Sequence, residues 1–222
     1  MDDDLSWNRQ HLVAEIIVDA RRTADLTGRE VFSERILGAF GTVPREKLVP
    51  EGARRNAYAN QPLSIGHGQT ISQPYIVALM TDLLNLRSVD RVLEVGTGCG
   101  YKTAVLIELA AHVFMVELIP ELQTEARDRL KALGYGNISF RLGDGWLGWP
   151  KEAPFDAVIV TAAPATLPPA LTAQLAPGGR LLAPVGRQHE TQFLTRILRR
   201  EDGGLEEERG LPVAFVPLVK TE

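Results

Sequence analysis

Between residues 91 and 185 the sequence alternates between strand patterns and helix patterns, and this alternation constrains the fold more than any other feature. The predicted strands are Arg91–Val95, Val113–Glu117, Ile138–Leu142, Ala157–Thr161 and Arg180–Val185. The predicted helices begin at Tyr101, run from Pro120 to Gly134 and lie near Pro168–Leu175. Regular alternation of this kind predicts an α/β fold with a doubly wound parallel sheet. Two further extended segments, Gln192–Arg199 and Leu205–Val219, bring this mostly parallel sheet to seven strands.

A cap of helices is predicted ahead of this core. An amphipathic helix is expected from about Asn8 to Leu26, with Ser6 as a candidate N-cap and Gly28 as its stop. A second, shorter helix is expected to begin near Ser33 and to end before Pro44. We therefore expect a single domain in three parts. These are a helical cap with a loop in residues 1–73, a ligand-binding core in residues 74–186 and C-terminal strands in residues 187–222.

The segment from Ala57 to Gln73 shows neither a helical nor a strand period. A structureless stretch of this length inside a compact domain is usually functional. Pro74 then starts a predicted helix that runs to about Leu86, because its fixed φ angle suits the first helical turn. The loop before Pro74 is therefore a candidate binding segment.

Composition and charge exclude several classes of protein. The net charge is −4 and the basic residues are interspersed with acidic ones, so no footprint for nucleic acid is visible. The most apolar stretch, residues 105–119, is broken by charged residues and predicts no membrane span. The single cysteine, Cys99, excludes an intrachain disulfide and fits a reducing compartment, so a cytoplasmic protein is expected. One cysteine and four histidines favour no metal site.

A glycine-rich turn follows the first strand of the core. Its sequence, Gly96-Thr97-Gly98-Cys99-Gly100, lets a ligand approach main-chain amides where side chains are absent. Tyr101 stands where a dinucleotide site has its third glycine, which argues against a nicotinamide enzyme. Glu117 ends the second strand, where a carboxylate can accept hydrogen bonds from ribose hydroxyls. Asp144, before Gly145, follows the third strand, where it can accept a bond from an adenine amino group.

These motifs resemble those of class I S-adenosylmethionine-dependent methyltransferases, whose fold is Rossmann-like. The family's glycine motif matches residues 94–100, and its two acidic positions match Glu117 and Asp144. The segments 155–160 and 175–181 resemble its fourth and fifth strand motifs. The resemblance implies S-adenosyl-L-methionine as cofactor and S-adenosyl-L-homocysteine as product. The implied cofactor-binding residues in the core are Gly96, Thr97, Gly98, Cys99, Gly100, Glu117, Leu118, Asp144 and Gly145. Cys99 is interpreted as a small residue facing the ligand, with a redox sensor as the alternative.

The loop Pro62-Leu-Ser-Ile-Gly-His-Gly-Gln-Thr-Ile-Ser-Gln-Pro74 resembles the signature of protein-L-isoaspartate O-methyltransferases. Residues 43–50, 143–146 and 213–218 resemble the same family. The resemblance implies a monomer that acts on isoaspartyl-containing proteins and peptides. It also implies site residues outside the core: the hydroxyl of Ser72 as the active-site group, Gln69, Thr70 and Ile71 beside the cofactor, and Val213, Phe215 and Val216 along the substrate backbone.

The chemistry of a carboxylate acceptor fits this sparse equipment. A carboxylate with a pKa of about 4 is already a nucleophile at neutral pH, so no general base is required. Ser72 can donate one positioning hydrogen bond, or it can cap the helix that starts at Pro74. His67 is assigned no essential role, since no G-x-S-x-G elbow supports a hydrolase.

The predicted function is methyl transfer to the free α-carboxylate of L-isoaspartyl residues in damaged proteins, a repair reaction. One alternative is a methyltransferase of the same fold with a small-molecule acceptor. The other is a non-catalytic protein that binds the cofactor. Two residues, Lys102 and Val219, depart from the family pattern and leave cofactor affinity open. Lys102 either points to solvent or places a positive charge near the sulfonium of the cofactor.

Overall fold

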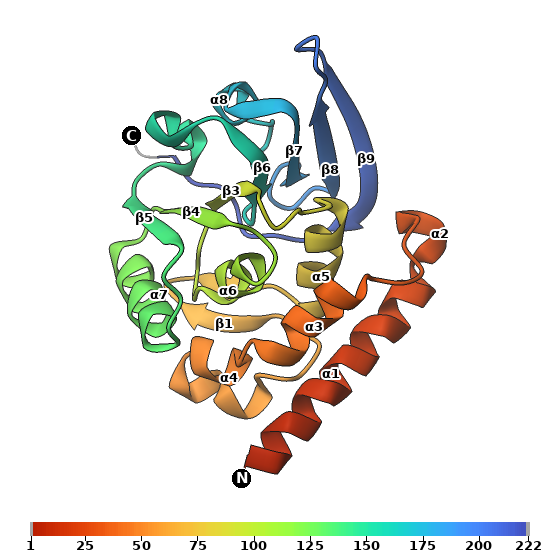
Figure 1. The fold of residues 1–222 in the computed structure, drawn as a ribbon, viewed down its shortest axis with the longest axis vertical. Coiled ribbons are helices and arrows are strands. Elements are labelled where there is room, and N and C mark those ends of the chain that lie inside the picture. Colours follow the sequence, from red (N-terminus) through yellow and green to blue (C-terminus); the bar gives the residue numbers. More distant parts are fainter. Residues whose placement is uncertain (1, 221–222) are drawn as a thin grey trace.

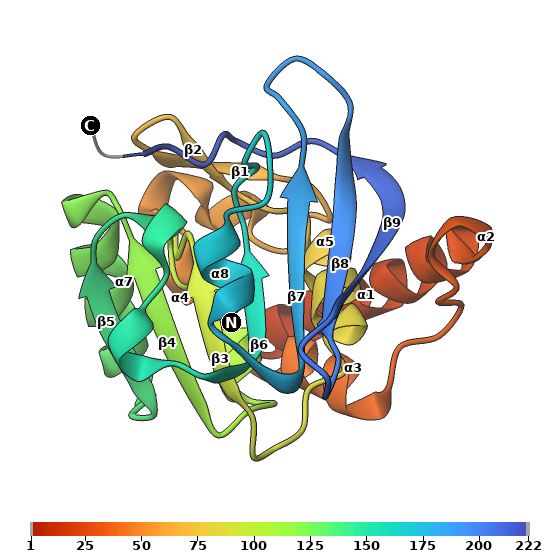
Figure 2. The ribbon, with the colours of Figure 1, turned by 90° about the horizontal axis from the view of Figure 1, so that it is seen from above.

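The computed structural model describes residues 2–220, with side chains described from residue 5. Seven strands form one sheet in the order β5-β4-β3-β6-β7-β8-β9, and they lie side by side in Figure 2. The strands are β3 (Arg91–Val95), β4 (His112–Glu117), β5 (Ile138–Leu142), β6 (Phe155–Val160), β7 (Leu175–Val185), β8 (Gln192–Arg199) and β9 (Leu205–Val213). The five strands from β5 to β7 pair in parallel, whereas β8 pairs antiparallel with both neighbours. The predicted doubly wound, mostly parallel seven-stranded sheet is confirmed.

The inner strands are buried on both faces, because alternate residues of each strand face separate hydrophobic cores. In β3, Val92 packs in a core with the helices of one face, and Leu93 packs in a second core with the other. The first face is covered by α5 (Pro74–Leu83), α6 (Tyr101–Ile107) and α7 (Pro120–Ala132), and the second by the short α8 (Pro169–Ala173). The chain winds from β3 to β5 on one side and from β6 to β7 on the other. This reversal of strand order beside β3 is where α/β sheets bind their ligands.

The N-terminal segment forms the predicted helical cap. It consists of α1 (Asp2–Arg22), α2 (Ala24–Thr27), α3 (Glu34–Thr42), α4 (Arg45–Leu48) and the 3₁₀ helix η1 (Glu51–Asn56). Figure 1 shows α1 lying across α3 and α5, and the three helices contact one another. Two predicted boundaries are confirmed: α3 begins directly after Ser33, whose side chain accepts a hydrogen bond from the Ile36 amide at 3.3 Å, and Gly28 stops the helical segment as the left-handed C-cap of α2.

Several predicted boundaries are wrong. Ser6 lies inside α1 instead of capping it, and the first helix breaks at Thr23. The helix from Pro74 ends at Leu83, and β9 ends at Val213 rather than continuing to Val219. The short helices α4 and η1 were not predicted, because one or two turns leave too little sequence for a period to show.

The loop expected to lack regular structure contains a hairpin of β1 (Leu63–Gly66) and β2 (Gln69–Ile71). Strands of four and three residues are too short to be recognised by alternation. Figure 2 shows the hairpin lying over the ends of the strands of the large sheet, above β3 and β4. Among residues 2–220, no helix is both long enough and apolar enough to cross a membrane.

Candidate active site

Three adjoining cavities lie between the hairpin and the carboxyl ends of the central strands. The first is bounded by β3, β4, the hairpin and residues 216–219. The second lies under the hairpin and is lined by Ser72, Thr97, Cys99 and Lys102 among others. The third opens toward residues 212–216. Thr70 and Thr161 line all three cavities and so stand where they meet.

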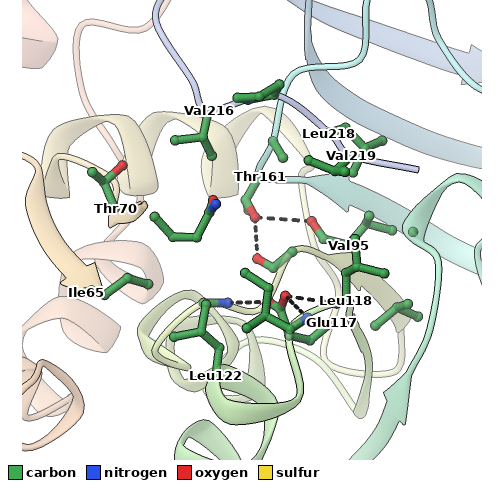
Figure 3. A pocket seen from close by; sticks show the side chains of 18 residues that line it. Ile65, Thr70, Val95, Glu117, Leu118, Leu122, Thr161, Val216, Leu218 and Val219 are labelled. Atoms are coloured by element: carbon green, nitrogen blue, oxygen red, sulfur yellow. Dashed lines mark hydrogen bonds between the residues drawn. The ribbon is translucent and has the colours of Figure 1, made fainter. Parts of the chain in front are cut away.

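Glu117 forms the base of the first cavity. One oxygen of its carboxylate accepts hydrogen bonds from the Leu118 amide at 2.9 Å and the Ile119 amide at 3.0 Å, and the other accepts from the Gly98 amide at 2.9 Å. These bonds hold an almost fully buried carboxylate, 6% exposed, in one orientation at the end of β4. Figure 3 shows Glu117 and Thr161 on the sheet side of the cavity, opposite Ile65 and Thr70 of the hairpin. The oxygen that accepts from Gly98 keeps a second lone pair, which a hydroxyl of a ligand can use.

The glycine turn lets the backbone approach the cavity closely. Gly96 has a φ of 88°, and a Cβ there would lie 2.6 Å from the Thr161 hydroxyl oxygen. A Cβ at Gly98 would lie 3.0 Å from the Ile65 side chain, which closes the cavity from the hairpin. The Thr161 hydroxyl shares its one proton between the carbonyl oxygens of Val95 and Gly96. Thr161 therefore holds the first residue of the turn in place.

The second cavity contains buried polar groups. The Thr97 hydroxyl is buried and has no hydrogen-bond partner among the described residues. Lys102 does not point to solvent: it is 7% exposed, and its ammonium donates to the Val77 carbonyl at 2.9 Å and the Thr81 hydroxyl at 2.7 Å. Desolvation lowers the pKa of Lys102 to about 7, although the nearby carboxylate of Glu94 opposes this shift. The alternative in which Lys102 points to solvent is therefore wrong, and a charge near the sulfonium stays a prediction.

Glu94 lies buried beneath the same turn. Its carboxyl accepts a hydrogen bond from the Thr103 hydroxyl at 2.5 Å, and its other oxygen has no partner among the described residues. Burial raises the pKa of Glu94 to about 8, while the hydrogen bond from Thr103 and the charge of Lys102 oppose that rise. A buried acid and a buried amine therefore lie close together below the cofactor turn.

The third cavity has an uncharged lining. Its walls are Pro62, Thr70, Ser72, Gln73, Ile76, Thr161 and residues 212–216. The Gln192 side chain fixes one wall, because it accepts from the Phe215 amide at 2.6 Å and donates to the Phe215 carbonyl at 3.1 Å. The Val216 carbonyl accepts from the Ala163 amide at 2.7 Å, which ties the same wall to the loop after β6. Ser72 lines both this cavity and the second one.

The structure brings most of the predicted site residues together. Gln69, Thr70, Gly96, Gly98, Glu117, Leu118, Gly145 and Val216 line the first cavity. Ile71, Ser72, Thr97 and Cys99 line the second, and Val213 and Phe215 line the third. Gly100 and Asp144 line none of the three. Gly100 caps α6, and one oxygen of the Asp144 carboxylate accepts from the Trp146 amide at 2.8 Å.

Two further findings concern predicted roles. Ser72 does not cap α5: the N-cap is Gln73, and no side-chain hydrogen bond closes that helix start. Thr161 was missed as a site residue, although its place after β6 was a usable signal, since side chains at carboxyl ends of parallel strands face the ligand. His67 lies exposed at the hairpin tip with a φ of 52°.

The residues present fit an adenosyl cofactor. Glu117 offers the remaining acceptor site of a fixed carboxylate to a ribose hydroxyl, and the space beside Gly96 and Gly98 would be filled by any side chain there. The partnerless hydroxyl of Thr97 and the adjoining second cavity can receive the amino-acid portion of such a molecule. The apolar side chains of Leu118, Ile119 and Leu122 can contact a base.

Comparisons with known proteins agree with this geometry. A family model described as "Protein-L-isoaspartate(D-aspartate) O-methyltransferase (PCMT)" matches residues 23–222. A protein-L-isoaspartate O-methyltransferase 1 of Cupriavidus necator is 49% identical over 98% of this chain and 84% of its own length. A protein-L-isoaspartate O-methyltransferase 2 of Polaromonas sp. is also 49% identical, over 93% of this chain and 98% of its own length.

Solved structures give the same answer. A protein-L-isoaspartate O-methyltransferase structure aligns with a TM-score of 0.79 and 26% identity over 94% of this chain, which spans 65% of that longer protein. A structure from Plasmodium falciparum in complex with S-adenosyl-L-homocysteine aligns with a TM-score of 0.76 and 26% identity, covering 93% of this chain and 98% of its own. The chain therefore belongs to the protein-L-isoaspartate(D-aspartate) O-methyltransferase family.

Proposed function

We propose that the protein transfers a methyl group from S-adenosyl-L-methionine to the free α-carboxylate of L-isoaspartyl residues in damaged proteins and peptides. The observation that carries this proposal is the position of Ser72. Ser72 lines both the second cavity, beside the glycine turn of residues 96–100, and the uncharged third cavity. An acceptor group in the third cavity would therefore meet the cofactor side of the site at Ser72.

Glu117, the turn from Gly96 to Gly98, and Thr97 would hold the cofactor in the first two cavities. Gln69, Thr70 and Ile71 would close over it from the hairpin. When bound, the cofactor supplies an activated methyl group on a sulfonium. The remaining task of the protein is to place the acceptor oxygen in line with that group and to exclude water.

The neutral lining of the third cavity suits a reaction in which a carboxylate loses its charge. A cationic side chain in direct contact would stabilise the anionic acceptor more than the transition state, and so would slow the transfer. Ser72 can instead donate a single hydrogen bond that orients the carboxylate without neutralising it. The carboxylate needs no base, since it is ionised at neutral pH.

Residues 213–216 would lie along the backbone of the acceptor peptide. The segment follows the edge strand β9 and lines the third cavity, where an extended peptide can run beside it. The adjacent peptide nitrogen would then attack the methyl ester formed on the α-carboxylate and release methanol, which gives a succinimide without further catalysis. Hydrolysis of that ring would return part of the population to ordinary aspartyl.

The cap, the core and the C-terminal strands would act as one domain, because each contributes a wall of the cavities. We also infer a monomer in the cytoplasm that needs neither nucleic acid nor membrane, in keeping with a net charge of −4 and one buried cysteine. Light scattering of the purified protein tests the monomer directly.

The decisive experiment is methyl transfer from radiolabelled cofactor to a synthetic peptide that contains L-isoaspartate, with the aspartyl peptide alongside. Only the isoaspartyl peptide should become labelled. The Ser72→Ala variant should lose about ten- to a hundredfold in kcat/KM, the worth of one hydrogen bond to a charged group. Ser64→Ala, at an exposed position of the same hairpin, is the matched control and should be unchanged. Cofactor binding without labelling of either peptide would refute the proposal and point to another acceptor.

A further inference from the structure

Arg45 is a fully buried cation in the cap, at the start of α4. Its exposed fraction is 0%, and no carboxylate of the described residues lies within ion-pair distance of it. Two of its nitrogens, Nε and Nη1, have no hydrogen-bond partner in the described part of the chain. A buried charge without an opposite charge is costly, so its retention calls for a specific role.

The contacts of Arg45 join two parts of the site. Its Nη2 donates a hydrogen bond to the Ser72 carbonyl at 3.1 Å. Its guanidinium carbon lies 4.4 Å from the centre of the Tyr101 ring, a cation–π contact. Tyr101 itself is held edge-on by Phe40 of the cap, with ring centres 6.1 Å apart. One planar group thus bridges Ser72, two residues before α5, and Tyr101, the first residue of α6.

Arg45 does not reach the cavities itself. It lines none of the three, whereas both residues it contacts, Ser72 and Tyr101, line the second. Its guanidinium therefore binds the Ser72 carbonyl from outside the cavities that cofactor and acceptor would occupy. This arrangement keeps the acceptor cavity uncharged while still using an arginine to fix the loop.

We propose that Arg45 is a positioning residue for the acceptor: by stacking on the Tyr101 ring and donating to the Ser72 carbonyl, it keeps the Ser72 hydroxyl turned toward the acceptor carboxylate. The inference rests on the proposed function of Ser72. A planar guanidinium can stack on the ring and donate in its own plane at once, which a lysine ammonium cannot do. The role is thus specific to arginine.

The test is a double-mutant cycle with Arg45→Lys, Ser72→Ala and the double variant. Arg45→Lys should lower kcat/KM for the isoaspartyl peptide by about tenfold or more, since small misplacements of a positioning group are that costly. Its affinity for S-adenosyl-L-homocysteine should stay within about twofold of wild type. In the Ser72→Ala background, Arg45→Lys should cost no more than about twofold, because the group it positions is gone. Arg54→Lys, at an exposed position of η1, is the control.

Equal losses from Arg45→Lys in both backgrounds would overturn the inference, because a purely structural role does not depend on the Ser72 hydroxyl. Hydrogen exchange of the amides in residues 69–73 gives a readout that needs no acceptor. Exchange should be faster in Arg45→Lys than in wild type, and unchanged exchange would also overturn the inference. If wild type does not methylate the peptide but exchange still accelerates, the proposed function fails while the contact of Arg45 with the loop stands.

Discussion

Replacing Lys102 with methionine tests the electrostatics of the second cavity. The buried amine has a pKa of about 7, lowered from 10.5 mainly by desolvation. Between these two pKa values the unfolded chain binds a proton that the folded chain has released, so the contribution of Lys102 to wild-type stability rises with pH. Methionine has nearly the same length and no proton to lose. The Thr81 hydroxyl keeps its own bond to the Val77 carbonyl at 2.7 Å, so the substitution strands no buried donor.

The magnitude follows from the fraction of proton released. At about pH 7 the unfolded state binds about half a proton more than the folded state, and at about pH 9 about one proton more. Each extra proton raises the free energy of unfolding by about 1.4 kcal/mol per pH unit. The wild type should therefore gain about 2 kcal/mol relative to Lys102→Met between these two pH values. Glu94 by itself has the opposite sign, because a carboxyl whose pKa burial raises to about 8 lowers the stability of both proteins as pH rises toward that value. Without Lys102 this pKa rises further, so the variant loses more stability than wild type as pH increases, and the difference between the two proteins changes in the same direction as the Lys102 effect.

Urea denaturation followed by tryptophan fluorescence measures this difference. At about pH 7 the variant should be more stable than wild type, since it has no ammonium to desolvate, and this advantage should shrink by about pH 9. Lys131→Met, at an exposed position of α7, is the control and should show no such trend. A stability difference that stays constant over this pH range would refute the reasoning, because Lys102 would then keep its proton in the folded protein.

Three further predictions concern the cofactor turn. Glu117→Gln should weaken binding of S-adenosyl-L-homocysteine by about ten- to a hundredfold in calorimetry, through loss of a charged acceptor, and should leave the KM for the peptide unchanged. Gly96→Ala should lower the free energy of unfolding by more than Gly28→Ala. Both glycines have positive φ angles, but only at Gly96 would a Cβ meet another atom within 4 Å; equal losses would show that backbone strain alone acts. Thr161→Val should lower kcat/KM by roughly tenfold, from the loss of one hydrogen bond to the Gly96 carbonyl, and Thr161→Ser should restore it. Wild-type activity in Thr161→Val together with a loss in Thr161→Ser would show that only the shape of Thr161 matters.

The accuracy of sequence-based prediction here follows the length and periodicity of each element. Strands Arg91–Val95, Ile138–Leu142 and Gln192–Arg199 were predicted at their observed bounds. They are short apolar or alternating runs between clear turn signals. The hairpin of β1 and β2 escaped notice because its strands are stabilised by packing over the large sheet rather than by a pattern of their own.

The sequence alone determined the sheet, the glycine turn with Glu117, and the segment that carries Ser72, because each is a local pattern with its own chemistry. Only the tertiary structure decided which groups meet: Thr161 at the junction of the cavities, Lys102 turned inward to α5, and Arg45 behind the Ser72 carbonyl. Lys102 and its partner Thr81 are 21 positions apart in the chain, and Arg45 and Ser72 are 27 positions apart. Packing of the cap against the core brings such residues together. Neither periodicity nor motif spacing predicts which buried side chains will be in contact.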